Sequence, residues 1–291
     1  MMGTKMLKHL RDAISHLNPD EVREEANRPV SVHLSALDDA AYARMENFLV
    51  PPGISPQKKS ELMRILHRSG AEPDLTAIRI YGEDVIRPEG AFSFNPNDPD
   101  RLVEEILGAR PELGIPLARH FYPFRQQVAE NIITSVSKEN ALFSVATAVP
   151  SIVPFVALPW AVGEFASDTA FLTMNQIRMA FLLSAASDRT VGYKEQKTEI
   201  ASLFASAFGW RALARELVGK IPFGGGLIPK AAVAYAGTYV VGCSLERLYR
   251  LGYGYTEQER RSAYEAAFER GKQVAGTLID AYRSRQHTAA T

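Results

Sequence analysis

The spacing of hydrophobic residues divides the chain into a polar first part and a strongly apolar second part. Apolar and polar positions alternate over residues 30–37, which predicts a strand, whereas after residue 116 apolar positions recur every three or four residues, which predicts helices. The most apolar run, 141–163, contains no Lys, Arg, Asp or Glu. We therefore predict a mainly α protein, in which a small N-terminal α/β unit precedes an α-helical bundle with two strongly apolar segments.

Capping residues and turn residues divide the first part into short elements. Asp38 and Ser55 stand at positions typical of helix N-caps, and Asp98 is expected to cap a third helix that begins at the next proline. Residues 76–82 and 91–95 predict two further strands. Strands and helices in this order indicate a small α/β layout.

The two apolar segments of the second part fit either of two environments. Residues 141–163 are as long as the roughly 20 residues that cross a bilayer, but three prolines break the run. Residues 231–245 form a shorter segment, in which the small residues Ala234, Thr238 and Gly242 would let another helix approach closely. These segments either insert into a membrane or form the core of a soluble bundle.

The C-terminal residues predict one long amphipathic helix. Thr256 and Glu259 stand in the register of a capping box. Apolar residues then recur at steps of three and four, at Tyr264, Phe268, Gly271, Ala275, Leu278 and Tyr282. This seam predicts a partner helix, either within the chain or in a second copy. We accordingly divide the chain into an α/β domain (1–112), a helical domain (113–255) and a C-terminal helix (256–291).

Charge and cysteine content narrow the classes of partner and compartment. Lys plus Arg equals Asp plus Glu, at 33 each, so no nucleic acid partner is predicted. Cys243 is the single cysteine and cannot form an internal disulfide, which is typical of a protein that faces the cytoplasm. The N-terminal residues lack an uninterrupted apolar core, so we expect no cleaved secretory signal.

The motifs of common enzyme classes are missing from the sequence. The six histidines do not share the spacing that aims two of them at one metal ion. Residues 37–42 place two carboxylates after the first strand, where a phosphate loop would need glycines, and no complete Walker signature occurs elsewhere. There is no Gly-x-Ser-x-Gly elbow. We predict a protein that is not an enzyme and that holds no cofactor or metal.

Several polar residues interrupt the apolar helices of the second part. They are Glu164, Asp168, Asn175, Gln176, Arg178 and Lys230. One hypothesis is that they form a buried polar cluster that lines a cavity or contacts a partner. The alternative is that they lie on the solvated side of their helices or pair locally, because structural ion pairs often imitate functional sites.

Four blocks of the second part resemble the YcjF-like domain-of-unknown-function family. They are ENALFSVATAVPSIVP, LPWAVGEFASDTAFLTMNQIRMAFLLSAA, GWRALARELVGKIP and GLIPKAAVAYAGTYVVG, which together cover residues 115–250 approximately. Members of this family are helical modules that are often fused to Era-type GTPase domains or described as inner-membrane proteins. The resemblance therefore implies a GTPase-associated helical module, and it supplies no catalytic residues. The first part lacks the phosphate loop and the Asn-Lys-x-Asp motif of those GTPases, so a GTPase ancestry would make it vestigial.

Two hypotheses of function follow from these patterns. The first is a non-enzymatic accessory protein of the inner membrane or its surface, facing the cytoplasm. The second is a cytoplasmic helical-bundle protein that binds a separately encoded GTPase or another protein partner. An enzyme acting on a lipid in a helical cavity is a third class, but the sequence supplies no set of nucleophile, base and orienting group.

Overall fold

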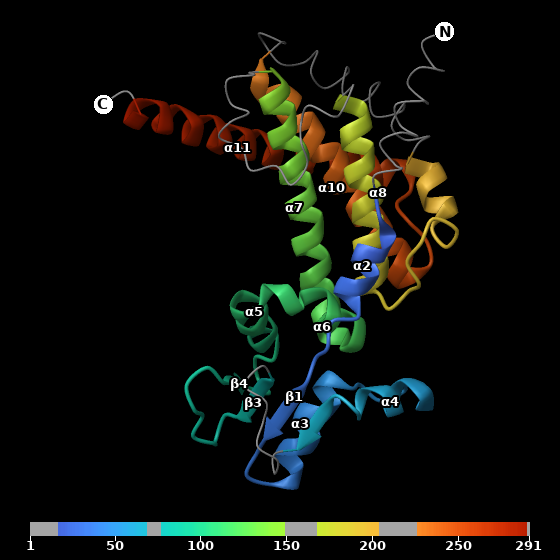
Figure 1. Ribbon diagram of the computed structural model, residues 1–291, viewed down its shortest axis with the longest axis vertical. Coiled ribbons are helices and arrows are strands. Elements are labelled where there is room, and N and C mark those ends of the chain that lie inside the picture. The colour runs from blue at the N-terminus through green and yellow to red at the C-terminus, as the bar shows by residue number, and fades with distance from the viewer. Residues whose placement is uncertain (1–16, 69–76, 149–167, 204–225, 290–291) are drawn as a thin grey trace. The chain divides into compact units, whose positions relative to one another are not determined.

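The fold is mainly helical, with one small parallel sheet (Figure 1). The computed structural model describes residues 17–68, 77–148, 168–203 and 226–289 of the 291-residue chain. This architecture confirms the predicted mainly α fold with a small α/β part.

The chain forms two compact units. We call the first the α/β unit, and it comprises Asp20–Glu130 together with the short segment Ser184–Thr190. The second, the helical unit, comprises Met1–Pro19, Asn131–Leu183 and Val191–Thr291. The chain thus enters the α/β unit twice, the second time for only a few residues after a long helix.

Four parallel strands form the sheet of the α/β unit in the order β2-β1-β3-β4. They are β1 (Val32–Ser35), β2 (Leu66–Arg68), β3 (Ile78–Gly82) and β4 (Phe92–Phe94). Alternate side chains at the start of β3 are buried, as the period-two pattern predicts, whereas three consecutive residues of β1, Val32, His33 and Leu34, are buried. The strands at 32–35, 78–82 and 92–94 confirm the three predicted ones. Strand β2 was not predicted, because three residues with a single buried apolar side chain give no periodic signal.

The helices of the α/β unit begin largely where capping residues predict. They are α2 (Pro19–Ala26), α3 (Asp39–Leu49), α4 (Pro56–Leu62), α5 (Asp100–Ala109) and α6 (Gly114–His120). Asp38 Oδ1 accepts a hydrogen bond from the Ala41 amide at 2.7 Å, and Ser55 Oγ accepts one from the Lys58 amide at 3.2 Å. Both predicted caps are therefore confirmed. The predicted Asp98 cap is wrong, because the Asp98 amide closes a turn on the Asn95 carbonyl and α5 begins two residues later.

The α/β unit continues beyond residue 112, where the sequence analysis placed its end. The following 3₁₀ turns and α6 bury Leu113, Phe121 and Phe124. The second of these turns contacts both α3 and α5. Short apolar segments after a helix look alike whether they close one unit or open the next, so the sequence alone could not place this boundary.

Long helices build the helical unit. They are α7 (Arg125–Ala148, in this unit from Asn131), α8 (Asp168–Ala186, in this unit to Leu183), α10 (Leu227–Leu251) and α11 (Glu257–Ala289). Helices α10 and α11 pack against each other along the predicted seam, with Tyr264 and Phe268 buried against Ala236 and Val240. A side chain at Gly271 would place its Cβ 2.9 Å from the Ala232 carbonyl oxygen, so glycine permits this close approach. The partner of the seam therefore lies within the chain.

Small residues on α10 let α7 and α8 approach it closely. A Cβ at Gly242 would lie 2.7 Å from Ile133 Cγ1 on α7 and 2.9 Å from Met179 Sδ on α8. Thr238, one turn earlier, is completely buried. The prediction that the small residues of this segment permit close helix packing is confirmed.

Within the described ranges, no helix combines the length and the hydropathy that a membrane crossing requires. Helix α10 contains the predicted apolar segment 231–245, but its last turns carry Glu246, Arg247 and Arg250. The prediction of a transmembrane helix is therefore not supported there. Of the other apolar run, 141–163, the last fifteen residues lie outside the described part of the chain.

Candidate functional site

Three amide side chains and one hydroxyl meet in the core of the helical unit. Asn140 Nδ2 on α7 donates to Thr238 Oγ1 on α10 at 2.8 Å, and Asn175 Nδ2 on α8 donates to Asn140 Oδ1 at 2.9 Å. Gln176 Nε2 donates to the same Thr238 oxygen at 3.4 Å. We call these four buried residues the amide network. Because a buried polar group is costly without a partner, the network fixes how three helices fit together.

The six polar residues singled out from the sequence do not form one cluster. Asn175 and Gln176 enter the amide network. Arg178 on α8 instead pairs with Glu139 on α7 at 3.0 Å, and Lys230 Nζ donates to Thr147 Oγ1 at 3.2 Å. Glu164 and the side chain of Asp168 lie outside the described part of the chain.

The short connection between α10 and α11 is held rigidly by its own contacts. We call residues 251–256 the α10–α11 turn. Gly252 ends α10 in the left-handed conformation, with φ of 87°, and its amide donates to the Leu248 carbonyl at 2.9 Å. Ser244 Oγ accepts a hydrogen bond from the Tyr255 amide at 3.0 Å. A Cβ at Gly254 would lie only 2.7 Å from that Ser244 oxygen, so the turn packs tightly against α10.

A capping box fixes the far end of the same turn. The Thr256 amide donates to Glu259 Oε2 at 2.8 Å, and the Glu259 amide donates to Thr256 Oγ1 at 3.3 Å, which confirms the predicted box. Arg247 Nη1 donates to the other Glu259 oxygen at 2.7 Å. The Thr256 amide, the Arg247 guanidinium and the Thr256 hydroxyl together lower the pKa of Glu259 to about 2.

This rigid turn presents apolar and aromatic side chains to solvent. Leu251 is 45% exposed and Tyr253 is 57% exposed. The Arg247 guanidinium lies between two rings, 5.0 Å from the centroid of Tyr253 and 5.2 Å from that of Tyr255. Tyr and Arg are enriched among the residues that dominate protein interfaces. The signal in the sequence is Gly-Tyr-Gly-Tyr between two helices, which the sequence analysis did not consider.

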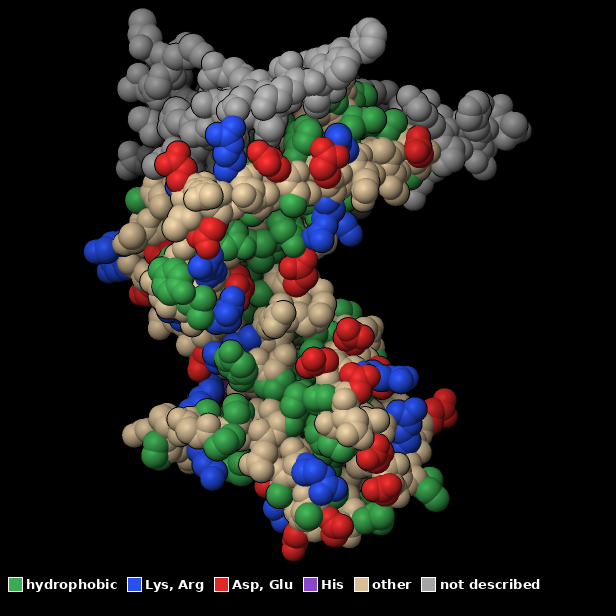
Figure 2. Space-filling model, turned by 180° about the vertical axis from the view of Figure 1, so that it is seen from behind, with side chains coloured by type: hydrophobic (Ala, Val, Ile, Leu, Met, Phe, Trp, Pro, Cys, Tyr) green, Lys and Arg blue, Asp and Glu red, His purple; other side chains and the backbone are tan. Residues whose placement is uncertain are grey.

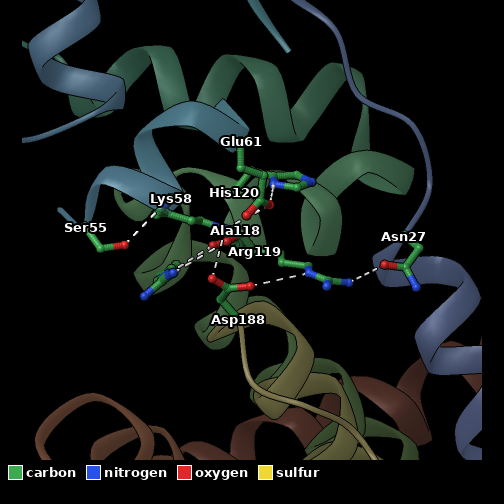
Figure 3. Close-up of polar contacts among 9 residues, drawn as sticks. Asn27, Ser55, Lys58, Glu61, Ala118, Arg119, His120 and Asp188 are labelled. Carbon is green, nitrogen blue, oxygen red and sulfur yellow. Dashed lines mark hydrogen bonds and ion pairs between the residues drawn. The ribbon is translucent and has the colours of Figure 1, made fainter. Parts of the chain in front are cut away.

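The α/β unit contains a charged cluster that the sequence analysis also missed (Figure 3). Lys58 Nζ on α4 lies 2.9 Å from Asp188 Oδ2, and Arg119 Nε on α6 lies 3.5 Å from Asp188 Oδ1. Glu61 Oε1 lies 3.2 Å from Lys58 Nζ and 3.1 Å from His120 Nδ1. We call these five residues the Asp188 cluster. They come from three segments far apart in sequence, so no local motif could have revealed them.

Burial shapes the electrostatics of the Asp188 cluster. Desolvation lowers the pKa of His120, and the nearby charge of Lys58 lowers it further. Arg125, at the start of α7, donates to the carbonyls of Ala118 and Arg119 at 3.0 and 3.5 Å. Burial lowers the pKa of Arg125, while the Asp188 carboxylate opposes this effect. The lowered pKa favours the uncharged form of His120 at neutral pH. The cations that act on the Asp188 carboxylate are then Lys58, Arg119 and Arg125.

Charges on the visible face of the molecule are mixed in sign. Figure 2 shows Lys and Arg side chains interspersed with Asp and Glu side chains over that face. Among the described residues, no group of three or more His, Cys, Asp or Glu side chains is placed to hold a metal ion. Among the described residues, the aromatic α10–α11 turn is the candidate functional surface.

Comparison with known proteins identified no relative. No family model matches the chain, no curated protein is significantly similar to it, and no solved structure is significantly similar to it. The resemblance to the YcjF-like family stays a prediction.

Proposed function

We propose that this chain is a non-enzymatic accessory protein that binds a protein partner through the α10–α11 turn. The observation that carries the proposal is the exposure of Leu251 and Tyr253 on a connection whose backbone is held at both ends. A partner that covers these two side chains would remove their apolar surface from water.

The rigidity of the turn supports this role. An interface residue that is already fixed in its bound conformation loses little conformational entropy when it binds. The glycine that ends α10, the Ser244 hydrogen bond and the capping box all restrict the turn before any partner arrives. Arg247 is stacked on Tyr253 and paired with Glu259, so its guanidinium is also in place.

The partner that fits this surface offers an apolar pocket. Arg247 is neutralised by Glu259, and Arg250 is paired with Glu246 at 2.6 Å, so the turn carries little net charge. We expect binding that depends on apolar burial and that changes little with salt. A separately encoded GTPase is our first candidate for the partner, and the inner-membrane surface is our candidate location, because the YcjF-like resemblance implies both.

Site-specific photocrosslinking tests the proposal and offers a closely matched control. Benzoylphenylalanine would replace Tyr253 in one full-length variant and Tyr122 in another, each expressed in cells of the source organism. Tyr122 is 56% exposed, and the centroid of its ring lies 5.5 Å from the Arg125 guanidinium carbon, but it belongs to the α/β unit. We expect a discrete protein adduct from position 253 and none of the same mass from position 122. Equal adducts from both positions, or none from position 253, would contradict the proposal.

Fractionation tests the proposed location separately. We expect the chain to sediment with membranes and to leave them in a high-salt or alkaline carbonate wash. Retention through both washes would contradict a surface location, and a fully soluble chain would favour the cytoplasmic alternative. Either result leaves the crosslinking experiment to decide whether a partner binds.

A further inference from the structure

We propose that His33 and His67 form a binding site for a zinc ion on one face of the parallel sheet. Both residues belong to the α/β unit, so the inference is independent of the proposed function. It rests on the register of two strands, on a contact between two imidazole rings and on a buried ring nitrogen that has no hydrogen-bond partner among the described residues.

The strands divide apolar and polar side chains between the two faces of the sheet. Val32 and Leu34 on β1 are the register partners of Ile78 and Ile80 on β3, and all four are buried. Because successive side chains of a strand point to opposite faces, the residues between them belong to the other face. The side chains of that face carry polar groups: His33, Ser35, His67, Arg79, Tyr81 and Ser93. Parallel sheets usually have two apolar faces, so this polar face is unusual.

The pairing of β1 with β2 brings two histidines together on the polar face. His33 and His67 are register partners, and their ring centroids lie 4.9 Å apart. Zinc binds histidine nitrogens at about 2.0–2.1 Å, so two such nitrogens must lie within about 4 Å of each other to share one ion. Rings at this separation meet that condition. Spacing in the sequence could not reveal the pair, because it detects histidines that share one helix.

The hydrogen bonding of His33 is typical of a metal ligand. Its Nε2 lies 3.2 Å from Ser31 Oγ, whereas Nδ1 is buried and has no hydrogen-bond partner within the described ranges. The residue as a whole is only 9% exposed. A ligating histidine usually donates its other ring N–H to a nearby acceptor, which leaves a lone pair on the ligating nitrogen. Ser31 Oγ can accept this hydrogen bond from Nε2, and a zinc ion would then satisfy Nδ1.

The surroundings of the pair favour a neutral ligand and allow an ion to enter. Burial and the proximity of His67 lower the pKa of His33, and the neutral ring is the form that binds metals. Arg79, the register partner of His33 on β3, donates to the Glu89 carbonyl at 3.1 Å, so its guanidinium is held at the loop after β3. His67 is exposed, so an ion can reach the pair from solvent. Water would complete the tetrahedral set of ligands that zinc usually takes.

Zinc titration of the purified full-length chain tests the site. Isothermal titration calorimetry would compare the wild type with His67→Ala, which changes an exposed position and should leave the fold intact. We expect this loss of a ligand to weaken zinc binding at least about tenfold. His120→Gln is the matched control, because it removes an imidazole from α6 of the same unit, and it should leave the affinity within about twofold.

Three outcomes of the titration would overturn the site. They are the absence of saturable zinc binding by the wild type, equal affinities of the wild type and His67→Ala, and equal losses in His67→Ala and His120→Gln. Thermal unfolding gives a second readout. Zinc should raise the Tm of the wild type but not that of His67→Ala, because an ion that binds only the folded state stabilises it.

Two further variants separate metal ligation from a structural role of the histidines. His67→Cys supplies a thiolate, which is also a zinc ligand, so it should restore the binding that His67→Ala loses. Ser31→Ala removes the partner of His33 Nε2 and should weaken zinc binding about tenfold, as the loss of such a hydrogen bond does at other metal sites. A thiol variant that binds zinc no better than His67→Ala, or an unchanged affinity in Ser31→Ala, would contradict the proposed ligation.

Discussion

The two polar clusters of this protein each join separate segments of the chain, one by neutral hydrogen bonds and the other by ion pairs. The amide network of the helical unit is neutral, fully buried and built from hydrogen bonds. The Asp188 cluster of the α/β unit is charged, half-buried and built mainly from ion pairs. Neutral hydrogen bonds in a dry core respond little to salt or pH, whereas partly exposed ion pairs respond to both. We therefore expect salt and pH to change the contacts of the Asp188 cluster more than those of the amide network.

The largest expected effect comes from the centre of the amide network. Asn140→Ala removes the amide that Asn175 and Thr238 both contact, so the buried Asn175 Nδ2 loses its acceptor and Thr238 keeps only the hydrogen bond from Gln176. We expect the free energy of unfolding of the helical unit to fall by about 3 kcal/mol, equally at 0.1 and 1 M NaCl. Urea denaturation measures this loss. Lys138→Ala, at an exposed position of α7 within the helical unit, is the control and should change stability by less than about 0.5 kcal/mol. A loss of unfolding free energy that depends on salt would contradict the expected difference in salt response between the amide network and the Asp188 cluster.

The second largest effect should come from close helix packing, where glycine substitutions in the two units should have opposite effects on stability. Gly242→Ala would force a methyl group against Ile133 and Met179, and we expect a loss of about 1–3 kcal/mol. Gly108→Ala, in α5 of the α/β unit, meets nothing within 4 Å. That substitution should stabilise the protein by about 0.5–1 kcal/mol, because alanine favours a helix over glycine. Thermal unfolding of both variants would show opposite shifts, and shifts of the same sign would contradict the packing described for α10.

Acid should weaken the α10–α11 turn in a defined range of pH. The pKa of Glu259 is about 2 in the folded protein and lies near 4.5 when the residue is unperturbed. The stability from the ionised carboxylate is therefore present above about pH 4.5 and is lost as pH falls toward 2. Glu259→Gln removes this contribution. The difference in unfolding free energy between wild type and variant should shrink as pH falls through this range, and a constant difference would contradict the account of the turn.

The smallest expected effect is the titration of His120. Its pKa is lowered in the folded protein, so the wild type should gain stability as pH rises toward about 6.5 and gain no more from this group above that value. His120→Gln should flatten this part of the stability profile. Denaturant unfolding at intervals between pH 5 and 7.5 measures the slope. An unchanged slope in the variant would show that His120 does not contribute to the pH dependence of stability.

Local signals in the sequence predicted local structure well. The caps at Asp38 and Ser55 and the box of Thr256 and Glu259 are confirmed, because each depends on residues three apart in the chain. The seam of α11 and the small residues of α10 are confirmed as well, since helical period alone places them on one face.

Features that depend on distant contacts could not be predicted. Asn175 and Gln176 stood out as polar residues in an apolar helix, but their partners are distant in sequence. Asn140 is 35 residues from Asn175, and Thr238 is 62 residues from Gln176, so only the fold brings them together. The Asp188 cluster joins α4, α6 and the end of α8. The sequence left residues 231–245 open between a membrane segment and a bundle core, because an apolar segment has the same composition in both, and a membrane span is not supported for α10.

Binding of the partner recovered by crosslinking tests the central claim most directly. Its affinity for the purified full-length chain would be measured for the wild type, for Tyr253→Ser and for the matched variant Tyr122→Ser. We predict that Tyr253→Ser weakens binding at least tenfold, about 1.4 kcal/mol, because a central aromatic contact dominates an interface of this kind. Tyr122→Ser should leave the affinity within about twofold. Equal affinities for all three proteins would contradict a function based on the α10–α11 turn.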